Sequence, residues 1–428
     1  MENMVLSREK RGAAVDWKKY RALFPHTFSP AEPALIAPYR ESNGNNHAGL
    51  AGAFGPKLAE INAPSPAMVY LNHAALGPMH SEAIAAIERH NRERSCGNIE
   101  FWPDLVEVKR SFKNLLGRFI NAAPEYLALT DSTSMGLNWL AQGLEWKPGE
   151  RILLNDFEFP SNVYPFLNLQ RRGVEIDFVK QRDGRIELED IAAMIRPQTR
   201  LLSISFVEFL NGFRNDLKEI GRLCRENNVI FCVDGIQGLG ALHLDVQESG
   251  IDFLVSGGQK WLMWPLGTAF MYISPRIFEQ VHPMAAGWLS VEDSWEFFKY
   301  ELKFLPTAER FEPGNYNAAG VAGAGASLEM FLEIGSRAIE QRILYITAYL
   351  IERLQENGYR IYTPLEPESR SGIVTFHHSN APALFEHLKS RRVHVSLRNG
   401  FIRVSPHFYN NEDDIDCLME LLLGFDRD

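Results

Sequence analysis

Short apolar runs alternate with longer amphipathic stretches along the chain from about residue 68 to residue 275. The amphipathic stretches, among them 188–195 and 217–226, have the spacing of helices that bury one face. The apolar runs are rich in β-branched and aromatic residues and lie at 151–154, 174–179, 201–207, 229–233, 253–255 and 268–273. This alternation predicts an α/β fold with a mostly parallel sheet that helices cover on both faces.

The segments on either side of this central pattern differ from it. Residues 1–66 are rich in polar and turn-forming residues and end in a Pro-rich stretch, which predicts an arm. A long helical stretch over 318–355 has a predicted break near Gly335, and shorter strands and helices follow it. We therefore predict an N-terminal arm over 1–66, a large domain over 67–335 and a small α+β domain over 336–428.

Composition narrows the classes of function. The 428 residues are 45% hydrophobic and carry a net charge of −10, without the basic stripe of a nucleic-acid-binding protein. We expect no membrane span, because no apolar run approaches the roughly 18 residues that one needs. The start of the chain lacks the apolar region of a signal peptide. The four cysteines show no metal-ligand spacing, so we expect no metal site and a cytoplasmic location.

The strongest chemical signal is a carboxylate and a lysine at the ends of successive predicted strands. Asp234 ends the run 229–233, and Lys260 follows the run 253–255. Ligands of parallel sheets bind at the carboxyl ends of the strands. Enzymes that use pyridoxal phosphate (PLP) need this pair, because the lysine forms a Schiff base with the cofactor and the carboxylate keeps the ring nitrogen protonated. An aspartate and a lysine by themselves are more often structural residues, so the segments around them must decide whether they form a PLP site.

Four segments supply the other parts of a PLP site. Hydroxyl groups precede a helix at 130–138, where a phosphate is favoured. Phe159 is suited to stack on a flat ring, and Gln237 is placed to donate to a phenolate oxygen. Ser256 lies close to Lys260 and is suited to phosphate. Arg403, on a later strand, offers a fork that matches an amino-acid carboxylate.

His73 is a further candidate substrate contact. It follows an apolar pair and precedes two alanines, a setting that also suits a packing histidine.

With these motifs in view, residues 68–424 resemble the class V aminotransferase family, which includes cysteine desulfurases, kynureninase, isopenicillin N epimerase-like enzymes and hercynylcysteine sulfoxide lyases. The resemblance rests on four segments: 70–78, 158–162, 233–237 and 256–260. It implies the fold-type-I architecture, with a seven-stranded, mostly parallel sheet in the large domain, and PLP as the cofactor.

The resemblance also implies roles for individual residues. Thr133 and Ser134 fall on the phosphate-binding pair of the family, and Arg403 falls on the arginine that binds the substrate carboxylate. Gln259 stands where desulfurases have a histidine that contacts the phosphate. Asn315 replaces the threonine with which each subunit of a homodimer reaches the phosphate of its partner.

One departure from the desulfurases bears on the reaction. Their nucleophilic cysteine lies in a loop shortly before the C-terminal arginine, and the matching stretch 391–400 contains no cysteine. Cysteine desulfurase activity is therefore disfavoured. We expect an enzyme that forms an external aldimine with an amino acid and removes its Cα proton through Lys260, most simply a lyase that expels a β-substituent.

Several alternatives remain open at this point. An aminotransferase or an amino-acid epimerase would use the same residues, and motifs 70–78 and 158–162 favour the lyase and epimerase branch. A ligand-sensing regulator that binds PLP without turnover would need a DNA-binding module, and residues 1–66 show no helix-turn-helix pattern. A relative that has lost its cofactor would not be expected to retain Lys260, Asp234, Gln237 and Arg403.

Overall fold

The computed structural model describes residues 15–27, 68–100 and 102–427. Its strands are β1 (Val69–Tyr70), β2 (Leu127–Thr130), β3 (Arg151–Asn155), β4 (Glu175–Val179), β5 (Thr199–Ser205), β6 (Ile230–Asp234), β7 (Phe253–Gly257), β8 (Ala269–Ile273), β9 (Val374–His377), β10 (Val393–His394), β11 (Ser396–Arg398) and β12 (Phe401–Val404). Its α-helices are α1 (Trp17–Arg21), α3 (Ser81–Arg92), α4 (Trp102–Ile120), α5 (Thr133–Gly143), α6 (Tyr164–Leu167), α7 (Leu188–Met194), α8 (Leu217–Glu226), α9 (Ala318–Ile334), α10 (Ser336–Glu356), α11 (Ala381–Ser390) and α12 (Glu412–Phe425).

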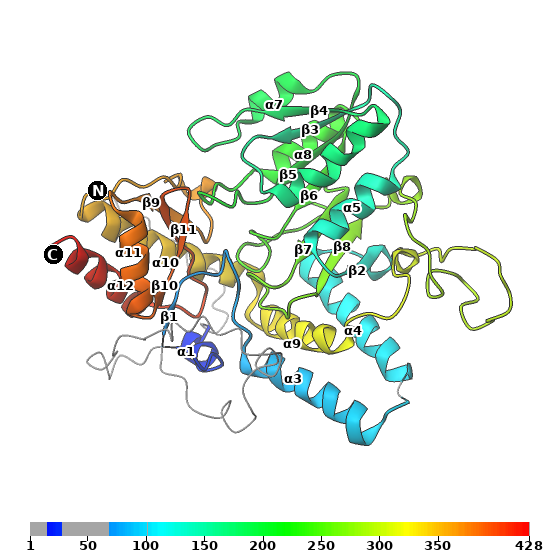
Figure 1. Ribbon diagram of the computed structural model, residues 1–428, viewed down its shortest axis with the longest axis horizontal. Coiled ribbons are helices and arrows are strands. Elements are labelled where there is room, and N and C mark those ends of the chain that lie inside the picture. The colour runs from blue at the N-terminus through cyan, green and yellow to red at the C-terminus, as the bar shows by residue number, and fades with distance from the viewer. Residues whose placement is uncertain (1–14, 28–67, 101, 428) are drawn as a thin grey trace, which may run out of the picture.

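A seven-stranded sheet forms the centre of the larger part of the molecule (Figure 1). Its strand order is β2-β8-β7-β6-β5-β3-β4, and β8 alone runs antiparallel to its neighbours. The predicted α/β class and mostly parallel sheet are confirmed. Strand β2 was not predicted, because its four residues are too few to establish a period.

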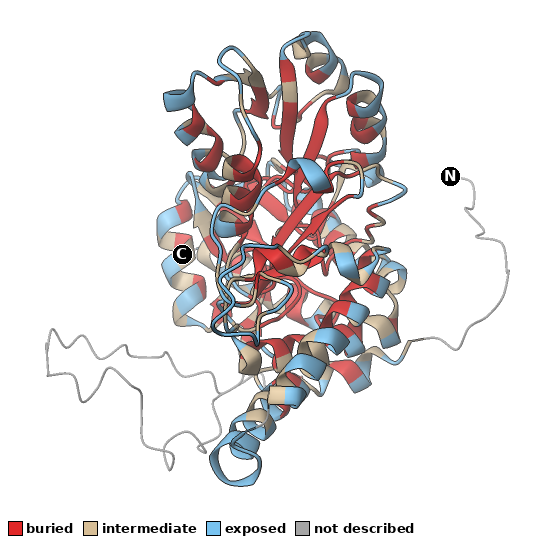
Figure 2. Cartoon of the chain, turned by 90° about the vertical axis from the view of Figure 1, so that its right-hand side faces the viewer, coloured by how far each residue is buried: buried red, intermediate tan, exposed pale blue. Residues whose placement is uncertain are grey.

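Both faces of this sheet are buried (Figure 2). Along β6, Phe231 and Val233 pack into one core cluster, whereas Ile230 and Cys232 pack into a second cluster on the opposite face. Successive side chains of a strand point to opposite faces, so a strand between two helical layers must be apolar at nearly every position. This requirement explains the near-continuous apolar runs in the sequence.

The C-terminal part contains a three-stranded antiparallel sheet of order β11-β12-β9, with α10, α11 and α12 packed around it. The predicted break in the long helical stretch occurs at Gly335, where φ is +89° and α9 gives way to α10. Strand β1 pairs in parallel with β10, so the chain touches the C-terminal part before it enters the large sheet. The three domain limits stay a prediction.

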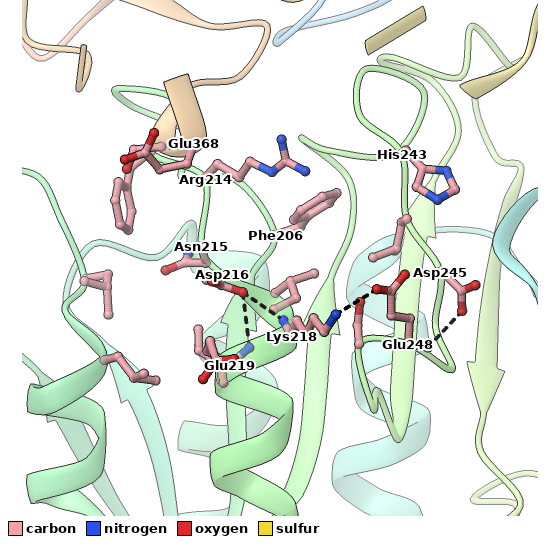
Figure 3. A pocket seen from close by; sticks show the side chains of 18 of the residues that line it. Phe206, Arg214, Asn215, Asp216, Lys218, Glu219, His243, Asp245, Glu248 and Glu368 are labelled. Atoms are coloured by element: carbon pink, nitrogen blue, oxygen red, sulfur yellow. Dashed lines mark hydrogen bonds and ion pairs between the residues drawn. The ribbon is translucent and has the colours of Figure 1, made fainter. Parts of the chain in front are cut away.

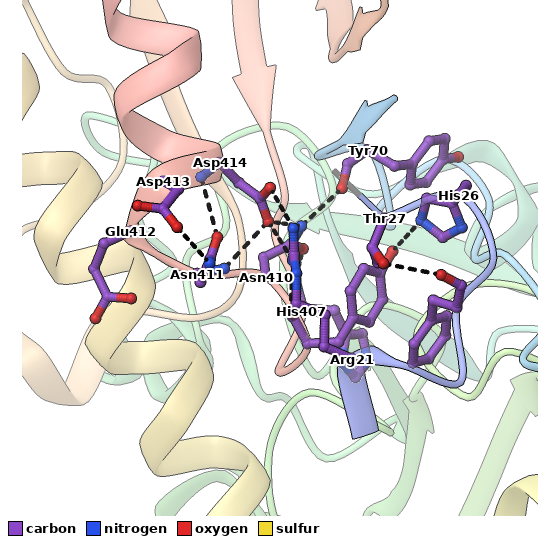
Figure 4. Close-up of polar contacts among 12 residues, drawn as sticks. Arg21, His26, Thr27, Tyr70, His407, Asn410, Asn411, Glu412, Asp413 and Asp414 are labelled. Atoms are coloured by element: carbon purple, nitrogen blue, oxygen red, sulfur yellow. Dashed lines mark hydrogen bonds and ion pairs between the residues drawn. The ribbon is translucent and has the colours of Figure 1, made fainter. Parts of the chain in front are cut away.

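Helix α1, within the predicted N-terminal arm, packs on the C-terminal part (Figure 4). Arg21 donates to Asp414 at 2.7 Å and to the carbonyl oxygen of Tyr409 at 2.8 Å. The ring of Phe24 stacks on that of Tyr409 at a centroid distance of 3.9 Å. This short segment therefore belongs to the folded body; the rest of the arm lies outside the described residues.

No helix among the described residues combines the length and the apolar character needed to cross a bilayer.

Candidate active site

The predicted lysine and carboxylate lie at the same edge of the large sheet. Strands β6 and β7 are adjacent and parallel, with Asp234 opposite Val255. Asp234 ends β6 and is 2% exposed, and Lys260 lies in the loop that follows β7. The carboxyl ends of neighbouring parallel strands meet at one edge, which brings the two side chains into the same site.

Each of the two groups shifts the ionisation of the other. Burial lowers the pKa of Lys260 to about 8; the charge of Asp234 opposes this effect, while Arg403 and Arg398 add to it. Burial likewise raises the pKa of Asp234 to about 6, against the opposing effects of the backbone N–H of Ile236 and the charge of Lys260. Lys260 thus has an appreciable neutral, nucleophilic fraction near neutral pH.

The loop that carries Lys260 is fixed by the predicted N-terminal motif. The backbone N–H of Gly77 donates to the carbonyl oxygen of Gln259 at 2.8 Å. A Cβ atom at position 77 would lie 2.0 Å from the carbonyl oxygen of Lys260, so only glycine allows this approach. Residues far apart in sequence therefore set the backbone of the lysine loop.

The predicted phosphate-binding residues gather where α5 begins beside β7. The hydroxyl of Thr133 accepts from the backbone N–H of Gly257 at 2.9 Å. A Cβ atom at Gly257 would lie 2.4 Å from Oε1 of Gln259 and 3.2 Å from Oγ1 of Thr133, so these two side chains converge on the glycine. Ser256 is fully buried, and Ser134 donates to Ser161 Oγ at 3.0 Å.

Phe159 and Gln237 lie on two sides of the same site. Phe159 is 43% exposed, and Lys260 Nζ is 5.6 Å from the centroid of its ring. Gln237 is buried, accepts from Trp261 Nε1 at 2.9 Å and donates to the carbonyl oxygen of Ala74 at 3.0 Å. An amide nitrogen has two protons, so one N–H of Gln237 remains for another acceptor.

Arg403 is a buried cation without a carboxylate partner among the described residues. It is 2% exposed, and it donates to the carbonyl oxygen of Phe209 at 2.6 Å and to Ser396 Oγ at 3.5 Å. Burial, and after it the charge of Arg398, lowers the pKa of Arg403 to about 9. The ring of Phe209 contacts Phe159 edge-on at 5.4 Å, which links the arginine to the lysine site. A buried guanidinium without a carboxylate partner favours the binding of an anion.

Two further predicted residues, His73 and Asn315, lie at the borders of this cluster in the single chain. His73 is 0% exposed; its Nδ1 is 3.2 Å from the carbonyl oxygen of Ser405, and its Nε2 is 3.1 Å from the Tyr409 hydroxyl. Both nitrogens of His73 are engaged within the single chain, a setting that also suits a packing histidine, and its substrate contact stays a prediction. Asn315 is exposed and lines a cavity of about 430 Å³ together with Thr130 and Asp131.

Sequence reasoning missed a group of buried carboxyl groups beside Asp234. Glu158 accepts from the backbone N–H and the hydroxyl of Ser205, each at 2.6 Å, and Ser205 lies opposite Asp234 in the sheet. Asn155 donates both to Glu158, at 2.9 Å, and to Glu208, at 3.3 Å. Glu208 follows a buried strand, and that position at a strand end is the signal that could have found it.

These residues fit PLP. The cofactor needs an amine, an acid for its ring nitrogen, donors for its phenolate oxygen and phosphate, and a flat apolar surface. Lys260 provides the amine, Asp234 the acid, Gln237 the donor for the phenolate oxygen, and Phe159 the flat apolar surface. The Thr133 hydroxyl and the Gln259 amide converge on Gly257; the Thr133 hydroxyl accepts from the Gly257 N–H and keeps its own proton for a phosphate, and the Gln259 amide group can donate through its nitrogen.

A larger cavity of about 550 Å³ lies elsewhere, at the start of α8 (Figure 3). None of the predicted site residues lines it. Lys218 pairs there with Glu248 at 2.9 Å, and Asp216 caps α8 through the N–H groups of Lys218 and Glu219. Its charged groups are thus engaged with one another, and we assign no chemistry to it.

Comparison with known proteins agrees with this geometry. The family model "Aminotransferase class-V" matches residues 69–418. A probable cysteine desulfurase of Methanothermobacter thermautotrophicus is 28% identical over 391 residues, covering 83% of this chain and 94% of the relative. A second, from Pyrococcus abyssi, is 30% identical over 329 residues, covering 72% and 81%.

Solved structures share the fold. The apo structure of a cysteine desulfurase from Thermococcus onnurineus NA1 has a TM-score of 0.77 at 23% identity and covers 84% of this chain and 94% of its own. The predicted family, the fold-type-I architecture and the PLP cofactor are confirmed. The chain belongs to the class V aminotransferases, a family of PLP-dependent enzymes.

Proposed function

We propose that this enzyme is a lyase that removes the Cα proton of an amino acid and expels a substituent from Cβ. The observation that carries the proposal is a set of three groups around one site: a lysine of lowered pKa, a buried aspartate at the end of the neighbouring strand, and a buried arginine of the C-terminal sheet whose charge acts on the lysine and which has no carboxylate partner among the described residues. These are the groups that hold an amino acid by its carboxylate and move its Cα proton.

Each side chain has a distinct task in this proposal. Arg403 binds the α-carboxylate and orients the Cα–H bond. Lys260, once its amine is free, would take the Cα proton; the electron pair of the C–H bond forms the Cα–Cβ double bond, the substituent leaves Cβ with its own bonding pair, and Lys260 would pass the proton to that leaving group. Asp234 holds a negative charge next to the cofactor ring nitrogen. When bound, PLP supplies a ring that delocalises the charge left at Cα. Phe159 covers that ring.

The remaining residues hold the cofactor. We assign Thr133, Ser134, Ser256 and Gln259 to the phosphate, because their side chains collect near the start of α5. Gln237 keeps one N–H for the phenolate oxygen, since its other contacts are made within the protein.

The cysteines argue against a route through a protein persulfide, which the names of the relatives suggest. Cys224 and Cys232 are 0% exposed, and burial raises the pKa of both thiols. Cys417 packs within the C-terminal part. Cys96 is exposed, but it lies beyond α3, in the π-helix η2 (Glu93–Gly97), and not in the loop 391–400 before Arg403. We therefore propose that the leaving group departs directly. All four thiols are free, which fits a reducing compartment such as the cytoplasm.

An amino-acid panel, assayed with the PLP-loaded protein, tests the reaction type. We expect ammonia and a 2-oxo acid to appear together without an added acceptor. A 2-oxo acid formed only with an amino acceptor would instead show an aminotransferase, and solvent deuterium at Cα without net turnover would show an epimerase. Alanine from cysteine, with the sulfur appearing as sulfide when a thiol reductant is added, would restore the desulfurase. Any of these three results contradicts the lyase.

We also propose a homodimer in which Asn315 reaches the phosphate of the partner subunit. Asn315 is exposed, and the segment after it leads into α9. The nearby chain exposes large apolar side chains, with Phe298 91% and Tyr300 89% exposed, as expected of a surface that a second subunit covers. Light scattering should give twice the chain mass of 48.6 kDa. A monomer at micromolar concentration would contradict the proposal.

A further inference from the structure

Arg398 lies at the tip of a hairpin beside the substrate arginine. Strands β11 and β12 are antiparallel and are joined by Asn399 and Gly400, whose φ angles are +47° and +80°. Two residues of positive φ make the tight turn that connects neighbouring strands. Arg398 is therefore the last residue before the turn and is held on a defined strand position.

The register of this hairpin puts Arg398 on the face that carries Arg403. Ser396 lies directly opposite Arg403, and Arg403 Nη2 is 3.5 Å from Ser396 Oγ, so their side chains share a face. Ser396 and Arg398 are two positions apart on one strand and point to the same side. The side chains of Arg398 and Arg403 therefore extend from the same face of the hairpin into the same space.

That space is the substrate side of the Lys260 site. Arg403 donates to the carbonyl oxygen of Phe209, whose ring contacts Phe159, the residue beside Lys260. The pKa shifts agree with this placement. The charge of Arg398 lowers the pKa of Lys260, as a smaller effect than burial and the charges of Asp234 and Arg403. It also lowers the pKa of Arg403, as a smaller effect than burial.

The charge of Arg398 is not neutralised by the described part of the chain. Arg398 is exposed, and it donates a hydrogen bond to the carbonyl oxygen of Leu397, at 3.4 Å. Arg398 differs in this respect from exposed arginines such as Arg222, which pairs with Glu219 and Glu226. Among the described residues, no carboxylate lies within 4.0 Å of Arg398 to form such a pair.

We propose that Arg398 binds a second anionic group, carried on the side chain of the amino-acid substrate, while Arg403 binds the α-carboxylate. The inference rests on the proposed function and names its substrate class: amino acids whose side chain ends in a carboxylate or a similar anion. A guanidinium offers such a group two parallel N–H donors. A neutral side chain gives Arg398 no partner and leaves the two cations facing each other.

Calorimetric titration of the PLP-loaded protein with two analogues tests this inference. Glutarate carries two carboxylates, whereas pentanoate has the same number of carbon atoms and one carboxylate. We expect glutarate to bind at least about tenfold more tightly, as one additional charge-assisted contact implies. The variant Arg398→Ala should lose this difference, and Arg398→Lys should retain part of it.

Matched variants show whether a change in affinity comes from recognition of the second anionic group by Arg398 or from the loss of any positive charge. Arg171→Ala removes another exposed arginine. Arg171 lies before β4, at the edge of the large sheet opposite to the one that carries Asp234 and Lys260. This variant should leave the affinities for glutarate and pentanoate unchanged. Arg403→Ala should weaken both ligands. Equal binding of glutarate and pentanoate by the wild-type protein, or an unchanged preference in Arg398→Ala, would overturn the inference. A protein that never acquires the absorption band of lysine-linked PLP would instead refute the proposed function.

Discussion

Replacing Lys260 with alanine is expected to abolish the absorption band of the lysine-linked cofactor at about 420 nm and to lower turnover by about 10²–10⁴-fold or more. The amine is the nucleophile that attaches the cofactor and the base that takes the Cα proton, so a single change removes both tasks. Absorption spectroscopy after addition of PLP and steady-state assays measure the two losses separately.

The control is Lys180→Ala, which removes an exposed lysine that pairs with Asp156. This variant should keep the band and the activity. Because the neutral amine reacts, the loading rate of wild-type protein should rise with pH until about 8 and then level off, following the pKa of Lys260. Survival of the band in Lys260→Ala would assign the linkage to another lysine and remove the basis of the proposed mechanism.

The elements that place Lys260 were readable in the sequence for a physical reason. Strands such as β6 and β7 are buried on both faces, and this burial forces apolar residues at nearly every position. Polar residues directly after such runs stand out, and they fall at the edge where parallel sheets bind ligands. Asp234 and Lys260 were found in this way.

The contacts that complete the site could not be predicted from the sequence, because they join residues that lie far apart along the chain. Arg403 reaches the carbonyl oxygen of Phe209 across 194 positions, and no local pattern records that pairing. The docking of Arg21 on Asp414 spans 393 positions and depends on a five-residue helix that periodicity does not reveal. His73 could be singled out as a candidate from the sequence, but only the fold shows that both of its ring nitrogens already have partners.

The carboxyl group of Glu208 is the clearest example of chemistry that depends on the fold. It is 0% exposed, it accepts from Asn215 at 3.0 Å and from Asn155 at 3.3 Å, and its Oε2 atom has no partner. Burial, and after it the charge of Glu158, raises the pKa of Glu208 well above the ordinary value. A neutral acid with one free oxygen fits this environment better than an anion does.

This protonation predicts how stability depends on pH. A carboxyl group whose folded pKa is raised binds a proton in the folded state that the unfolded state has released. Its stabilising effect is complete below the unfolded pKa of about 4.3 and is lost as pH rises toward the folded pKa. One such proton changes the free energy of unfolding by about 1.4 kcal/mol per pH unit. Between these two pKa values, Glu208 therefore makes the wild-type protein less stable as pH rises.

Glu208→Gln is expected to remove this loss, because an amide keeps a neutral group of the same shape beside Asn155 and Asn215. In urea unfolding at saturating PLP, the variant should lose less stability than the wild type as pH rises above about 5.5. Glu88→Gln, an exposed change on α3, should follow the wild type. Equal pH slopes for Glu208→Gln and the wild type would show that Glu208 is ionised in the folded enzyme. The buried charge beside Asp234 would then need a cation from outside the described residues.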